Sequence, residues 1–149
     1  YHGIFPNTKK AMVEFLERME ARKHDVAFAI RLKSNNRHIG NVGIHGIDWI
    51  HRFGGIGILI GEKDCWGKGY GNEALRLLLA YGFDKLNLNK INISCHAEHK
   101  AAIACYKKVG FKQEGLFREE FYRDGKYHDR VSMGMTKREY QKRDDRVKN

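Results

Sequence analysis

Long apolar runs, paired cysteines and proline are all scarce in this sequence of 149 residues. No apolar run approaches the roughly 18 to 20 residues that span a bilayer, and the first residues lack the basic lead and apolar stretch of a signal peptide. Cys65, Cys95 and Cys105 are odd in number and show no paired spacing. This argues against a disulfide framework and for a reducing compartment. We therefore expect a soluble cytoplasmic protein with no membrane partner.

Acidic residues are also few. The chain has 28 Lys and Arg against 18 Asp and Glu, so its net charge is +10 without its eight His. This surplus favours an anionic partner, and nucleic acid, a membrane surface and a phosphorylated cofactor are all compatible with charge alone. Apolar residues at 42% and charged residues at 31% are typical of a folded domain and exclude disorder of the whole chain.

Hydrophobic periodicity predicts one mixed α/β domain over residues 1–149, with no repeat or linker. An apolar stripe at residues 12, 15, 16 and 19, expected to pack on the core, follows a cap at Asn7 or Thr8. Helices are expected at about 8–22, 70–86 and 99–109, and strands at about 26–32, 37–45, 55–61, 91–95, 111–122 and 127–135. The run 55–61 is nearly all apolar, which predicts the centre of the sheet. The basic tail at about 136–149 shows no clear apolar period and is expected to fray.

A glycine-rich loop joins the central strand to the long helix. It reads Trp66-Gly67-Lys68-Gly69-Tyr70-Gly71. A strand, such a loop and a helix N-terminus place unpaired backbone N–H groups and the positive end of a helix dipole around one point, which suits a phosphate or pyrophosphate. Glycines let the backbone approach the ligand closely, and Lys68 adds a cation. A Walker loop needs Ser or Thr after Gly-Lys, and a dinucleotide fingerprint needs G-x-G-x-x-G, so neither nucleotide motif fits.

The loop resembles the R/Q-x-x-G-x-G/A signature of the Gcn5-related N-acetyltransferases (GNAT), whose backbone amides hold the pyrophosphate of acetyl-CoA. Residues 98–111 are similar to the family's N-x-x-A/S-x-x-x-Y-x-x-x-G-F segment, and Gly115 and 125–133 look like the branch of ribosomal-protein alanine and spermidine acetyltransferases. The resemblance implies an α/β (α+β) fold, a single GNAT-like domain with a mixed, mostly antiparallel central sheet flanked by helices. It also implies that the family's N-terminal strand and helix are missing from this sequence.

The resemblance further implies an N-acetyltransferase that uses acetyl-CoA as acetyl donor. Backbone amides around Ile58, Leu59 and Ile60 are expected to bind the pantetheine arm and to polarise the thioester carbonyl. His99, where the family usually has Asn, shares one helical face with Ala102 and Tyr106, and this face is expected at the thioester end. We expect Tyr106 to protonate the departing thiolate, as a positioned acid rather than a strong one.

The general base has no clear candidate on the central strand, because Gly55 stands where many relatives carry Glu. His45 is the first alternative, since an imidazole titrates near neutrality and His45 ends the strand beside the central one. Asp48, Glu62 or a relay through water are the others. The missing carboxylate favours an amine that deprotonates readily.

His96, Glu98 and His99 invite a metal interpretation, but zinc deaminases also need P-C-x-x-C and the only proline is Pro6, so we expect no metal. The acceptor stays open among a nucleotide-linked amino sugar, a protein N-terminus and a polyamine, and the +10 charge favours amines on anionic molecules. A different class of function is a nucleic-acid or ribosome-binding module with a vestigial loop, using Arg31, Lys33, Arg37 and the tail. Nucleic acid is the weaker expectation, and a homodimer is compatible with either function.

Overall fold

The computed structural model of the chain describes residues 8–21 and 24–148, without the side chains of residues 19, 20 and 144–148. Six strands form one sheet in the order β1-β2-β3-β4-β6-β5. The strands are β1 (Val26–Arg31), β2 (His38–Asp48), β3 (Phe53–Ile60), β4 (Lys90–His96), β5 (Lys112–Arg123) and β6 (Lys126–Thr136). The helices are α1 (Lys9–Ala21), α2 (Tyr70–Ala80), α3 (Lys100–Val109) and α4 (Lys137–Lys148), with short turns η1 (Lys63–Cys65) and η2 (Tyr81–Lys85). Within this described part, no helix is long and apolar enough to cross a membrane.

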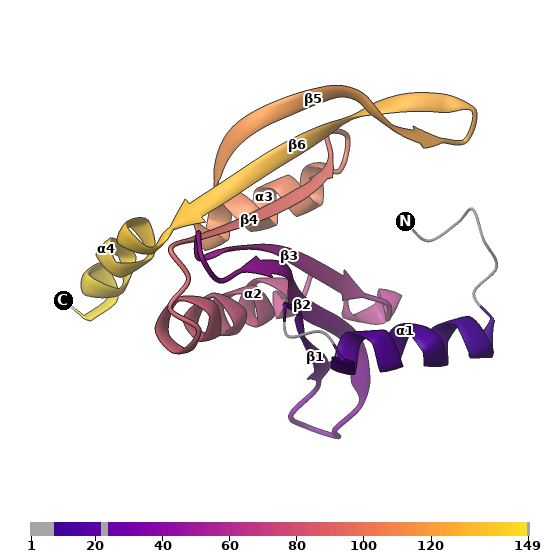
Figure 1. Cartoon of the computed structure of the whole chain (residues 1–149), viewed down its shortest axis with the longest axis horizontal. Coiled ribbons are helices and arrows are strands. Elements are labelled where there is room, and N and C mark those ends of the chain that lie inside the picture. The colour runs from indigo at the N-terminus through magenta and orange to yellow at the C-terminus, as the bar shows by residue number, and fades with distance from the viewer. Residues whose placement is uncertain (1–7, 22–23, 149) are drawn as a thin grey trace.

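The sheet is mixed and mostly antiparallel, as predicted. Only β3 and β4 pair in parallel among the paired strands of the described residues. The apolar run that predicted a central strand lies in β3, which has two strands on one side and three on the other. Figure 1 shows the β5–β6 hairpin as a long arm that projects past α3. Its turn contains the pair Asp124-Gly125, a dipeptide suited to a hairpin, and both residues have positive φ.

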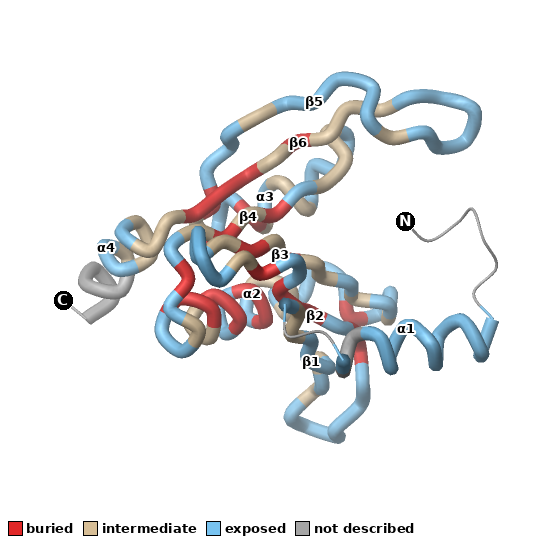
Figure 2. The backbone as a smooth tube through the Cα atoms, in the orientation of Figure 1, coloured by how far each residue is buried: buried red, intermediate tan, exposed pale blue. Residues whose placement is uncertain are grey.

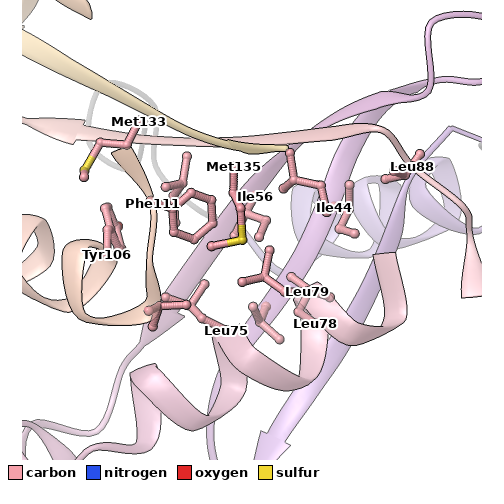
Figure 3. Packing of buried hydrophobic residues seen from close by; sticks show 14 of the residues in the cluster. Ile44, Ile56, Leu75, Leu78, Leu79, Leu88, Tyr106, Phe111, Met133 and Met135 are labelled. Carbon is pink, nitrogen blue, oxygen red and sulfur yellow. The ribbon is translucent and has the colours of Figure 1, made fainter. Parts of the chain in front are cut away.

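The core lies between the sheet and the two helices α2 and α3, which contact each other. Figure 3 shows Leu75, Leu78 and Leu79 of α2 facing the sheet residues Ile44 and Ile56. Burial of each such leucine contributes about 1.5–3 kcal/mol to folding. In Figure 2 the buried stretches run through α2 and the inner strands, whereas α1 and β5 are largely exposed. The long helix is therefore fixed firmly against the strands that it connects.

The N-terminal helix α1 begins as predicted, because the Thr8 hydroxyl accepts the N–H of Ala11 at 3.1 Å. Asn7, the other predicted cap, lies outside the described residues, as does the side chain of Met19. The expectation that the apolar stripe packs on the core is wrong for the described side chains, since it is 45–54% exposed at Met12, Phe15 and Leu16. Figure 1 shows the reason: α1 extends beside the sheet and not across it.

The predicted helix at 70–86 is divided into two segments. Its regular part, α2, ends at Ala80, and the next turn is a wider π-helical one in which the N–H of Leu86 donates to the carbonyl of Tyr81. At Gly82 the helix backbone comes very close to Ile44 and Ile91 of the sheet. The wider turn thus lies where the helix backbone closely approaches side chains of the sheet.

The C-terminal tail forms a helix, α4, so the expectation of a frayed tail is wrong for residues 137–148. Thr136 and Glu139 form a capping box: the Thr136 N–H donates to the Glu139 carboxylate at 2.9 Å, and the Glu139 N–H donates to the Thr136 hydroxyl at 3.3 Å. The Tyr140 ring stacks on Phe83 at 5.0 Å, and its hydroxyl donates to Asp84 at 2.8 Å. These contacts hold the first turn of α4 against η2.

Candidate active site

The parallel strands β3 and β4 separate along their length. They pair only from Phe53 to Ile56 and from Lys90 to Ile93. Beyond these pairs β3 continues to Ile60 on the β2 side, while β4 continues to His96 on the β6 side. Backbone groups alternate in direction along a strand, so about half of those between residues 57 and 60 face the opening. The split therefore exposes hydrogen-bonding backbone in the middle of the sheet.

The glycine-rich loop ends in a set of unpaired amides at the start of α2. Gly67 and Gly69 have φ of 72° and 87°, a conformation that L side chains rarely adopt. The first hydrogen bond of α2 runs from the Glu73 N–H to the Gly69 carbonyl at 3.1 Å, so the N–H groups of residues 70–72 have no partner inside the helix. Apart from the adjacent residues of the chain, no heavy atom of the described residues lies within 4 Å of the position of a Cβ on either glycine. The amides thus border open space and form a site suited to a phosphate.

Side-chain contacts hold this loop in place from both sides. The Trp66 indole N–H donates to the carbonyl of Ile60 at 2.8 Å, which ties the loop to the end of β3. Before it, Asp64 accepts two hydrogen bonds from the Arg37 guanidinium, at 2.8 and 3.1 Å, and Glu62 pairs with the same group. Arg37 lowers the pKa of the Asp64 carboxyl through these bonds. The β1–β2 turn and the loop are therefore joined by one bidentate ion pair.

A groove of about 580 Å³ lies between the end of β3, the loop and α3. It brings together eleven residues that the sequence predicted for cofactor binding: Ile58, Leu59, Ile60, Trp66, Gly67, Gly69, Tyr70, Gly71, His99, Ala102 and Tyr106. Lys68 and His45 do not line it. Further lining residues that sequence reasoning missed are Cys65, Asn72, Leu75, Ala101, Ala104, Cys105 and Lys108. Spacing offered a signal for some of them, because residues 101, 104, 105 and 108 share a helical face beside Ala102.

His99 and Tyr106 lie on the same side of α3, about two turns apart. His99 is its N-cap, and its Nδ1 accepts the N–H of Ala102 at 3.3 Å. Tyr106 is 7% exposed, and its ring packs edge-on to Phe111 with centroids 6.3 Å apart. Among the described residues every fully buried side-chain polar atom has a partner, and the Tyr106 hydroxyl makes no hydrogen bond within them. This hydroxyl is therefore accessible from the groove.

Burial keeps the Tyr106 phenol protonated. Removal from water raises its pKa above the ordinary value of about 10, and the nearby Cys95 and Cys105 raise it further. A phenol in this state offers a proton but does not lose it spontaneously at neutral pH. The side chain thus fits a positioned acid at the end of the groove.

His45 lies on the face of the sheet opposite α2. It is inside β2 rather than at its end, because β2 continues to Asp48, and its Cα is paired with that of Gly55. Its Nε2 lies 3.2 Å from the position that a Cβ on Gly57 would take. Asn92 of β4 approaches from the other side, with its Oδ1 3.0 Å from the corresponding position on Gly55. Two polar side chains therefore border the glycines of β3 near the split.

The two other candidate bases are engaged in local structure. Asp48 accepts the N–H groups of His51 at 2.7 Å and Ile50 at 2.9 Å, and these bonds, that of His51 first, lower the pKa of its carboxyl. Glu62 is paired with Arg37. Each carboxylate thus has a structural role in a turn or a loop.

The residues that suggested a metal site each have a separate contact. His96 stacks on Phe121 with ring centroids 4.2 Å apart, and burial lowers its pKa. Glu98 bonds to Nδ1 of His128 at 2.8 Å, a contact that raises the pKa of His128. His99 caps α3. In the described part of the chain, no three metal-ligating side chains are grouped so that they could hold an ion.

Comparison with known proteins places this geometry in context. The family model described as "Acetyltransferase (GNAT) domain" matches residues 1–112. An uncharacterized N-acetyltransferase p20 of Bacillus licheniformis is 31% identical over 144 residues, which are 94% of this chain and 80% of that protein. A putative ribosomal N-acetyltransferase YdaF of Bacillus subtilis is 33% identical over 102 residues, 68% of this chain and 55% of that protein.

A solved structure resembles the whole fold. It is that of the spermidine N-acetyltransferase of Vibrio cholerae in complex with CoA and spermine. The TM-score is 0.86 at 27% sequence identity, and the match covers 91% of this chain and 79% of that one. The strand order and the helices described above are thus those of a known acetyltransferase fold.

Proposed function

The chain belongs to the GNAT acetyltransferase family, and from this premise we propose that it transfers the acetyl group of acetyl-CoA to a primary amine by direct attack on the thioester. Acetyl-CoA supplies the acetyl group and a thiolate leaving group. The groove carries the proposal, because the unpaired amides of the loop, the free edge of β3 and the Tyr106 hydroxyl all border it. Direct transfer needs positioning, polarisation and proton transfer, and no covalent enzyme intermediate.

Binding uses backbone more than side chains. The amides of Tyr70, Gly71 and Asn72 at the start of α2 suit the pyrophosphate, since they add to the positive end of the helix dipole. Lys108 also lines the groove and supplies a cation on the α3 side. The free backbone groups between residues 57 and 60 pair with the amide-containing pantetheine arm much as a neighbouring strand would.

Proton transfer is divided between the two faces of the split. On the groove side, Tyr106 gives its phenol proton to the sulfur as the C–S bond breaks. On the opposite face, His45 takes a proton from the attacking amine, and solvent restores both side chains afterwards. This division leaves a clear path for the amine, which approaches from the side that the donor does not occupy.

The acceptor is a primary amine, and two observations favour different kinds. Similarity to a spermidine N-acetyltransferase favours a polyamine. The net charge of +10 favours an amine on an anionic molecule, such as a nucleotide-linked amino sugar or a protein N-terminus on an acidic surface. An acceptor screen that detects released thiol, with spermidine, short peptides and a nucleotide-linked amino sugar, identifies the class.

Substitution of Tyr106 tests the chemistry. Tyr106→Phe keeps the ring and removes the proton, so turnover should fall by roughly 10- to 1000-fold while acetyl-CoA affinity changes little. Tyr122→Phe is the matched control, because Tyr122 is 62% exposed on the hairpin arm and is not a groove residue. Unchanged turnover of Tyr106→Phe, with chemistry shown to limit the rate, would contradict the assignment.

A further inference from the structure

The face of the sheet opposite α2 has a distinct composition near the split. Side chains alternate along a strand, so the buried Ile44 and Ile56 point toward α2, while His45, Gly55 and Gly57 belong to the other face. The His45 side chain is 43% exposed there. Since Gly57 is the first β3 residue beyond the last β3–β4 pair, this histidine lies beside the beginning of the split.

The His45 imidazole lies over a pair of facing glycines. Gly43 and Gly57 are Cα partners across β2 and β3. A Cβ on Gly57 would lie 3.2 Å from Nε2 and 3.3 Å from Cδ2 of the ring. A Cβ on Gly43 would lie 3.2 Å from Cε1 and closer still to the Val26 carbonyl oxygen. The ring therefore lies in a slot above the two glycines, which the backbone of β1 also borders at Gly43. A side chain on Gly57 would shift the ring.

The Asp25 carboxylate lies beside the other edge of the same ring. Its Oδ1 lies 3.9 Å from Nδ1 of His45, and its side chain is only 5% exposed. The same oxygen accepts the N–H of Gly46, the residue after His45, at 2.7 Å. The carboxylate is therefore held by the strand that carries the histidine. The neighbouring His24 faces away into another contact, with Nδ1 bonded to the Ile47 carbonyl at 2.8 Å.

We propose that Asp25 is a positioning residue for acetyl transfer: with the Gly43–Gly57 slot, it holds the His45 imidazole so that Nε2 accepts the proton of the amine at the split. This inference rests on the proposed function. The amine lone pair forms the new N–C bond, its proton goes to Nε2, the C–S electron pair goes to sulfur, and Tyr106 protonates that sulfur. Asp25 stabilises the imidazolium that results, because opposite charges at this separation attract.

Asp25→Asn tests the role without removing the acceptor of the Gly46 N–H. Plateau kcat/KM should fall roughly 10-fold, a part of the 100- to 10,000-fold that a general base supplies. The KM for acetyl-CoA should not change. Asp129→Asn is the matched control, because Asp129 also accepts one backbone N–H, that of Glu119 at 2.9 Å.

A second substitution distinguishes the positioning role of Asp25 from the proton-accepting role of His45. In a His45→Gln background, Asp25→Asn should have no further effect. If Asp25→Asn lowers kcat/KM by the same factor in that background, the positioning role of Asp25 is wrong while His45 keeps its own. If His45→Gln alone retains full turnover, both assignments fail, and Tyr106→Phe then tells whether the transfer chemistry itself stands. Should Asp25→Asn not fold, Asp25→Ser retains an acceptor oxygen for Gly46 and answers the same question.

Discussion

Gly69 allows a sharp test of the amide site, because the chain contains a matched control. Gly69 has φ of 87° and open space where a Cβ would lie, and Gly125 has φ of 78° and equally open space. Both glycines therefore impose the same backbone strain on an alanine, about 1–2 kcal/mol for a left-handed residue. They differ in place: Gly69 borders the groove, whereas Gly125 lies in the β5–β6 turn.

The two variants are expected to differ in Tm only when acetyl-CoA is present. At 100 times its Kd, the ligand stabilises the native state by about 2.7 kcal/mol, and a chain of this size gains about 2–4 °C in Tm per kcal/mol, so Tm rises by roughly 5–11 °C. In the proposed binding mode, a methyl group on Gly69 would enter the space of the pyrophosphate. If it weakens binding about 100-fold, the same ligand concentration stabilises by only about 0.4 kcal/mol, or about 1–2 °C.

The assay is a thermal melt of wild type, Gly69→Ala and Gly125→Ala with and without acetyl-CoA, supported by calorimetric titration. Without ligand the two variants should lose a similar amount of stability. With ligand, Gly125→Ala should regain the wild-type increment and Gly69→Ala should not. If Gly69→Ala binds acetyl-CoA with wild-type affinity as a folded protein, the assignment of the loop to the pyrophosphate is wrong.

Two further predictions concern acid stability and acceptor charge. Hydrogen bonds from Lys112 and the Thr136 N–H lower the pKa of Glu139 from 4.5 to about 2; the depressed pKa contributes stability above pH 4.5 that disappears as pH falls toward 2, so the Tm advantage of wild type over Glu139→Gln should vanish over that range. Amines on anionic molecules should outperform spermidine at low salt, and their advantage should shrink at high salt, because screening acts beyond about 10 Å at 0.1 M. A strong rate with spermidine that salt does not affect would contradict the second prediction.

Local patterns predicted most of the fold because the relevant interactions are local. The turn at Asp124-Gly125 and the cap at Thr8 each depend on a few adjacent residues. The loop before α2 could also be predicted from the sequence, because its glycines and the start of the helix are contiguous. The sequence also indicated two segments that line the groove. One is this loop, and the other is α3, where the residue spacing placed His99, Ala102 and Tyr106 on one face.

The errors arose where distant segments meet. The capping box of α4 is visible in the sequence at Thr136 and Glu139, but the partners of Tyr140 are more than fifty residues away, at Phe83 and Asp84. The apolar stripe of α1 led to a wrong expectation of burial, because periodicity does not say whether another element covers a helix face. The burial of α1 and the docking of α4 both depend on which distant segments lie beside them.

The position of the His45 ring depends on the glycines of β3. This dependence cannot be seen when each sequence position is considered separately. Sequence alone registers Gly55 as a missing carboxylate and His45 as an isolated imidazole. In the structure, a side chain at Gly57 would occupy the space of the His45 ring, and one at Gly55 would meet the Asn92 amide. A side chain at Gly57 and the His45 ring therefore exclude each other, whereas a side chain at Gly55 conflicts with Asn92 and not with the imidazole. Glycine at 57 is thus what lets the imidazole lie over β3.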